Sequence, residues 1–171
     1  MTVHPRTDEL VDSIRWSFEA FVMPDLTDEY AISVAHTIRN LLQHVSLRIQ
    51  LEGPALDEHR RELRSVLSDI REFAEVSQCA ALADVPGRVN AALEADGPDA
   101  VPPPGVVDLG EKVVALRWAL DGALRSLQAA KGELGGDERY VAVRSAIRDC
   151  LGRQLEREAA WITPAFSGRR R

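Results

Sequence analysis

Four polar side chains on one stretch of the chain could carry chemistry: His36, Asn40, Gln43 and His44. Helical spacing places all four within one arc of a helix expected over residues 27–52, opposite its apolar row. A metal site would need further ligands to converge. The Glu-x-x-His pattern of ferritin-like bundles, the His-Glu-x-x-His pattern and paired zinc cysteines are all absent from the sequence. We therefore favour a solvated polar face, and expect neither a metal ion nor a cofactor.

Two tryptophans form the second candidate site. Trp16 and Trp118 each lie about 200° around their helix from the apolar residue two positions earlier, so both point away from the main apolar rows. Each follows an arginine, Arg15 or Arg117. The tryptophans either cover the backs of their own helix pairs or form an interface, since exposed Trp and Arg are typical anchors at interfaces. If the tryptophans form an interface, Arg15 and Arg117 belong to that interface as well.

The elements that position these residues are amphipathic helices. Apolar residues recur at helical spacing over 7–22 and again over 27–52, where the main row is Val34, Ile38, Leu41, Val45 and Ile49. Pro24 ends the first helix. Gly53 and Pro54 are expected to end the second helix, so that the chain folds back.

A third helix is expected within 54–83, with Leu56, Leu63 and Leu67 on its apolar face. Its segment DEHRRELR, residues 57–64, is interpreted as the charged outer side. The segment 97–108 contains three consecutive prolines, and this composition predicts an extended, stiff connection.

The cleanest apolar row follows this connection. Its members step by three and four residues along a fourth helix, which favours a neighbouring helix at a shallow crossing angle: Leu109, Val113, Leu116, Leu120, Ala123, Leu127, Ala130 and Leu134. A fifth helix, beginning near Asp137, completes a second hairpin over 109–162. No stretch alternates with a period of two, so no sheet is expected.

The two hairpins resemble each other. A constant offset aligns residues 27–52 with 137–161, including Ile38-Arg39 with Ile147-Arg148, which indicates an internal duplication. Each hairpin has one apolar side, and burying these sides against each other is the simplest solution. The sequence thus predicts an all-α fold: one domain over 1–171, an antiparallel four-helix bundle made of hairpins 7–52 and 109–162, with a crossover helix at 54–83.

Composition narrows the class of partner. The formal net charge of −6 argues against broad nucleic-acid binding, because phosphate repels an acidic surface. No apolar run approaches the roughly 20 residues that a membrane span requires, and the N-terminus has no apolar signal core. Cys79 and Cys150 lie inside helical patterns, which favours a reducing, cytoplasmic environment.

The segment HTIRNLLQHVSLRIQL, residues 36–51, resembles the His box of sensor histidine kinases, and LSDIREFAEVS resembles the second helix of that family's hairpin. The resemblance covers 36–77 and implies that His36 accepts a phosphoryl group, with Asn40 beside it. Thr37 stands where the family has an acid, Leu41 where it has proline, and no ATP-lid segment follows. A phosphotransfer protein without its own ATP-binding domain therefore stays as the alternative function.

A second resemblance covers residues 9–67. FVMPDL before a long helix, followed by QLEGPAL and a helix rich in Arg, Glu and Leu, is similar to small helical proteins encoded beside acyl-CoA dehydrogenases and aminoglycoside-phosphotransferase-like enzymes. This implies an accessory role near acyl-CoA metabolism. With no catalytic constellation in view, we expect a non-catalytic accessory or protein-interaction protein that binds a protein partner or forms a homodimer.

Overall fold

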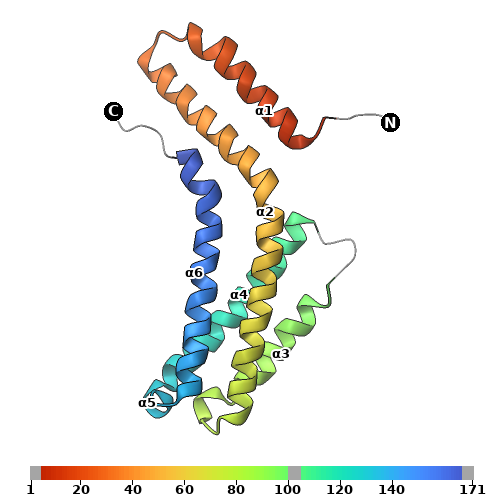
Figure 1. The fold of residues 1–171 in the computed structure, drawn as a ribbon, viewed down its shortest axis with the longest axis vertical. Coiled ribbons are helices and arrows are strands. Elements are labelled where there is room, and N and C mark those ends of the chain that lie inside the picture. The colour runs from red at the N-terminus through yellow and green to blue at the C-terminus, as the bar shows by residue number, and fades with distance from the viewer. Residues whose placement is uncertain (1–4, 100–104, 167–171) are drawn as a thin grey trace. The chain divides into compact units, whose positions relative to one another are not determined.

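The chain is all-α. The computed structural model describes residues 5–99 and 105–166, and every regular element within these ranges is helical (Figure 1). Residues 100–104, from the expected proline-rich connection, lie outside the described ranges. None of the described helices combines the length and the apolar character that crossing a membrane demands. The α-helices are α1 (Thr7–Ser17), α2 (Glu29–Val76), α3 (Val85–Asp96), α4 (Val106–Ala129), α5 (Lys131–Leu134) and α6 (Glu138–Phe166). A π-turn (Phe18–Val22) and 3-10 turns (Met23–Asp25, Ala80–Leu82) complete the set.

One long helix replaces two expected ones. The prediction that Gly53 and Pro54 end a helix is wrong, because α2 runs from Glu29 to Val76 with Pro54 inside it. Pro54 removes a single backbone hydrogen bond, to the carbonyl of Gln50, while the turns on either side keep theirs. The expected crossover helix 54–83 is therefore the second half of α2, followed by a separate short turn.

The chain divides into two compact units near this same point. The N-terminal unit comprises Met1–Glu52 and Glu156–Arg171, and the central unit comprises Gly53–Leu155. The Gly-Pro pair thus marks the boundary between units within a continuous helix. That the two units fold together as one domain over 1–171 stays a prediction, as does the internal duplication.

The hydrophobic core belongs to the central unit. It joins the second half of α2 with α3, α4 and α6 (Figure 1). The prediction for the fourth helix is confirmed, because its row from Leu109 to Ala130 is buried and Leu134 packs against the core. The Tyr140 hydroxyl donates to the Leu127 carbonyl at 2.9 Å and ties the start of α6 to the end of α4.

The N-terminal unit is packed differently from the expectation. Five apolar residues of α2, here called the exposed row, remain 39–49% exposed: Val34, Ile38, Leu41, Val45 and Ile49. The buried side of this part of α2 carries small residues, Ala35 and Ser46, and Ser46 donates to Asp12 of α1 at 3.0 Å. Within the described ranges, the core cluster contains no residue from 7–52. That the two hairpins bury their apolar sides against each other therefore stays a prediction.

Candidate functional site

The main concentration of buried polar groups in the central unit is one stretch of α2, residues 57–64, here called the polar turn. Its interpretation as a charged outer side is wrong, because His59 is only 2% exposed and Arg60 only 1%. The reason is that this part of α2 is covered on two sides, by α3 and by α6 (Figure 1). Adjacent residues on a helix point about 100° apart, so His59 and Arg60 reach different neighbours.

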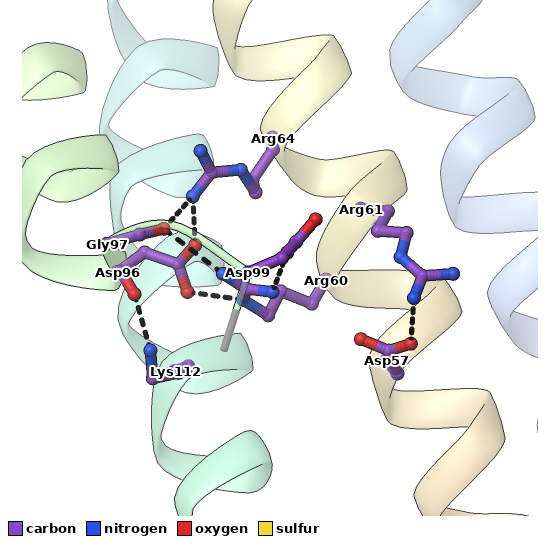
Figure 2. Close-up of polar contacts among 8 residues, drawn as sticks. All are labelled: Asp57, Arg60, Arg61, Arg64, Asp96, Gly97, Asp99 and Lys112. Carbon is purple, nitrogen blue, oxygen red and sulfur yellow. Dashed lines mark hydrogen bonds and ion pairs between the residues drawn. The ribbon is translucent and has the colours of Figure 1, made fainter. Parts of the chain in front are cut away.

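On the α3 side, Arg60 is the centre of an ion-pair network (Figure 2). Its Nε donates to Asp96 at 2.7 Å, and its Nη1 donates to Asp99 at 2.7 Å. Arg64 donates to the other oxygen of Asp96. Both side chains of the Arg60–Asp96 pair are 2% exposed. The pair is thus desolvated, and each partner depends on the other for compensation of its charge.

The backbone at the end of α3 takes part in this network. Gly97 adopts φ 73°, a left-handed conformation that favours glycine, and its carbonyl accepts from Arg60 at 3.2 Å and from Arg64 at 2.7 Å. Lys112 of α4 donates to the Asp96 carbonyl (Figure 2). Three cations therefore surround the negative end of the α3 dipole and the carboxylate of Asp96.

The contacts within this ion-pair network shift the pKa values of its own charged groups. Burial, the largest single influence, raises the pKa of Asp96, but the hydrogen bonds and the positive charges of Arg60 and Arg64 together outweigh it and hold that pKa below its usual range. The hydrogen bond to Asp96 raises the pKa of Arg60, against the opposing effect of its burial. The hydrogen bond from Arg60 lowers the pKa of Asp99. All of these groups are charged at neutral pH, which suits a structural clamp between α2, α3 and α4 and not proton transfer.

The α6 side of the polar turn brings together a different set of groups. His59 and Glu62 lie one turn apart on α2, and Cys150 faces them from α6. Their ligand atoms all lie within 4.8 Å of one another. Arg117 of α4 donates to Nε2 of His59 at 3.2 Å. Arg153 of α6 donates to Glu62 at 2.6 Å, and this hydrogen bond raises the pKa of Arg153.

The residues predicted for phosphotransfer lie in the N-terminal unit, away from the polar turn in sequence. His36 is exposed on α2, and Asn40, one turn later, is half-buried and accepts from Arg39 at 3.3 Å. Gln43 and His44 are half-buried. The structure therefore places only His36 of the four in the solvated position that was expected.

Both tryptophans are exposed. Trp16 is 61% exposed and Trp118 is 70% exposed, so the interpretation that each covers the back of its own hairpin is wrong. Trp16 makes an edge-to-face contact with Phe21, with ring centroids 5.3 Å apart. Trp118 borders a shallow groove with Arg88 and Gly122. The two tryptophans belong to different units.

Their neighbouring arginines have partners within the chain. Arg15 lies 3.4 Å from Asp12 in an ion pair, and Arg117 contacts His59. The role of all four residues as an interface stays a prediction.

Sequence reasoning missed the polar turn, although a signal was present. The apolar row of the expected third helix runs Leu56, Leu63, Leu67 and so skips one helical turn. His59 and Arg60 occupy the skipped positions. A gap in an otherwise regular row, filled by polar residues, indicates buried polar groups with partners elsewhere in the chain.

Comparison of the chain with family models, with curated proteins and with solved structures finds no match.

Proposed function

We propose that this protein is a non-catalytic helical interaction protein that associates with a second copy of itself through the N-terminal unit. The observation that carries the proposal is the contrast between two apolar rows of the same spacing. The row of α4 is buried in the central unit, whereas the exposed row of α2 stays 39–49% exposed among the residues that the structure describes. An apolar helix face of this length in water favours a partner.

The exposed row continues onto α1. Leu10 and Ile14 are 48% and 57% exposed. On a helical projection, each row lies roughly a quarter to a third of a turn from the more buried side of its own helix. In an antiparallel pair whose more buried sides face each other, both rows then lie on the same side of the pair. Together the seven side chains expose on the order of 500 Å² of apolar surface, which is at the upper end for a monomer. With flanking polar groups this face approaches the roughly 800 Å² per partner of a specific interface.

Charge complementarity supports a second copy as the occupant. Residues 7–22 contain four acidic residues and one arginine, whereas residues 30–51 contain two arginines and no acidic residue. A two-fold arrangement places α1 of each copy against α2 of the other, so that acidic and basic helices meet twice. Two hairpins joined in this way form a four-helix bundle with an apolar interior.

Light scattering coupled to size exclusion tests the proposal. Wild type is expected at twice the chain mass. The double change Ile38→Glu with Val45→Glu places two carboxylates within the exposed row and is expected to give a monomer with unchanged helical circular dichroism. The control is Ser33→Glu, an exposed position on α2 outside the row, which should stay dimeric. A monomeric wild type at high concentration would refute the proposal.

The alternative function is phosphotransfer through His36, and the exposure of that imidazole supports it, because a phosphoacceptor must be accessible. Incubation with phosphorylated response regulators, followed by detection of acid-labile phosphate, tests it. Labelling of wild type that is lost in His36→Gln supports this alternative, and an unlabelled wild type ends it. The resemblance of residues 9–67 adds acyl-CoA metabolism as the proposed setting for either function.

A further inference from the structure

The geometry points to a divalent transition-metal site, of the zinc class, formed by His59, Glu62 and Cys150. The three ligand atoms lie within 4.8 Å of one another. In a tetrahedral zinc site with bonds of about 2.0–2.3 Å, donor atoms lie roughly 3.5 Å apart. Shifts of the side-chain donor atoms by about 1 Å would therefore bring them to bonding distance around one ion.

The donor set is one that zinc takes. Imidazole nitrogen, carboxylate oxygen and thiolate sulfur are its three protein ligand types, and three protein ligands leave a fourth position for water. The His-x-x-Glu spacing places two donors on one face of α2, and Cys150 supplies the third from α6. His59 and Cys150 are 2% and 0% exposed. The Glu62 side chain is 17% exposed and provides the route of entry.

Two guanidinium groups hold these donors in the metal-free chain. Arg117 donates to Nε2 of His59, so this nitrogen acts as an acceptor and the imidazole is neutral, the form that binds metal. Arg153 donates to Glu62. In the metal-free chain each guanidinium group places a positive charge against a donor atom, the nitrogen of His59 or the oxygen of Glu62, to which the ion would bond. The Arg153 side chain is 49% exposed and can swing into solvent. Arg117 borders a groove lined by leucines of α4 and α6 and can withdraw into it.

Binding then consists of an exchange of cations. The ion bonds to the imidazole, the carboxylate and the sulfur, the S–H bond of Cys150 breaks, and its proton passes to the buffer. A thiolate and a carboxylate neutralise the two charges of the ion, which allows both arginines to leave. The ion would cross-link α2 to α6 within the central unit. If the ion bonds to Nε2, the nitrogen that accepts from Arg117, removal of Arg117 should strengthen metal binding.

Titration of the metal-free, reduced protein with Co²⁺ tests the site, because cobalt bound to a thiolate gives a charge-transfer absorption band. Wild type should show the band at one equivalent, with displacement by Zn²⁺ and release of about one proton. Cys150→Ala should abolish the band. Cys79→Ala is the matched control, because this second buried cysteine lies beside Glu133 and outside the site. It should leave both band and affinity unchanged.

Three further variants sharpen the test. Glu62→Gln keeps the side-chain volume and should weaken binding at least tenfold, while helical circular dichroism confirms folding. Arg117→Met should bind Co²⁺ several-fold more tightly than wild type. His44→Ala, in the N-terminal unit, should bind like wild type. The proposal is overturned if wild type shows no band, if the band survives Cys150→Ala, or if it disappears in Cys79→Ala or His44→Ala. Unchanged affinity in Arg117→Met would overturn the competition between arginine and metal.

Discussion

Removal of the Asp96 carboxylate is the sharpest perturbation of the central unit. In Asp96→Ala, Arg60 stays buried and loses its buried carboxylate partner, and breaking one side of a buried ion pair costs about 3–5 kcal/mol. Arg60 keeps Asp99 at 2.7 Å and the Gly97 carbonyl at 3.2 Å. These remaining contacts favour the lower end of the range, about 3 kcal/mol. The contact between Lys112 and the Asp96 carbonyl uses the backbone and survives the change.

Two comparisons isolate the cause of this loss. Asp57→Ala removes a surface pair with Arg61 from the same polar turn, where the Arg61 side chain is 63% exposed, and should cost at most about 0.5 kcal/mol. Arg60→Met with Asp96→Leu removes both buried charges and replaces them with apolar groups. This double variant should lie within about 1 kcal/mol of wild type. The assay is urea unfolding followed by circular dichroism, with the slope compared between variants.

The result that would refute this reasoning is specific. If Asp96→Ala costs no more than Asp57→Ala, the Arg60 guanidinium is not desolvated in solution. If the apolar double variant is as unstable as the single one, the loss comes from packing at the end of α3 and not from an uncompensated charge.

Three other predictions concern Asp96, Pro54 and Trp118. Because the folded-state pKa of Asp96 lies below its ordinary value of 3.8, the stability it contributes is fully present above pH about 4 and lost as pH falls further, so acid unfolding should be steeper in wild type than in Asp96→Asn. Equal slopes in the two proteins would contradict this. Pro54→Ala restores a hydrogen bond within α2 and should raise the free energy of unfolding by roughly 1–3 kcal/mol; a decrease would show that the helix needs the proline. Trp118→Ala should cost less than about 1 kcal/mol because the side chain is 70% exposed, and a loss above about 2 kcal/mol would mean that the ring is buried.

Helix content was predictable from the sequence because periodicity reports it directly. The row from Leu109 to Ala130 is regular, and its burial was expected correctly. The sequence predicted a helix end at Gly53 and Pro54, but α2 continues through both residues. A local helix-breaking signal carries no information about the packing that keeps the flanking turns helical. The signal did coincide with a real feature, the boundary between the two units.

Which apolar row is buried could not be read from spacing alone. The rows of α2 and α4 have the same period, yet only one lies in the core. The side of α2 that faces α1 is marked by small residues, Ala35 and Ser46, and small residues permit close approach of helices without an apolar signal.

The polar turn shows a further limit of sequence reasoning. The partners of Arg60 and His59 lie 36 and 58 positions further along the chain, at Asp96 and Arg117. No local pattern connects such residues, and only the interruption between Leu56 and Leu63 marked the site. Cys150 is likewise distant in sequence from His59 and Glu62 on α2, and only the folded structure brings these residues together.

Hydrogen–deuterium exchange at low and high protein concentration tests the central claim most directly. If the exposed row is a self-association surface, amides of residues 30–51 should exchange more slowly at high concentration, while those of 105–155 keep their rates. The change should be absent in the Ile38→Glu, Val45→Glu variant. Rates over 30–51 that do not depend on concentration, or protection that rises over 105–155 instead, would contradict it.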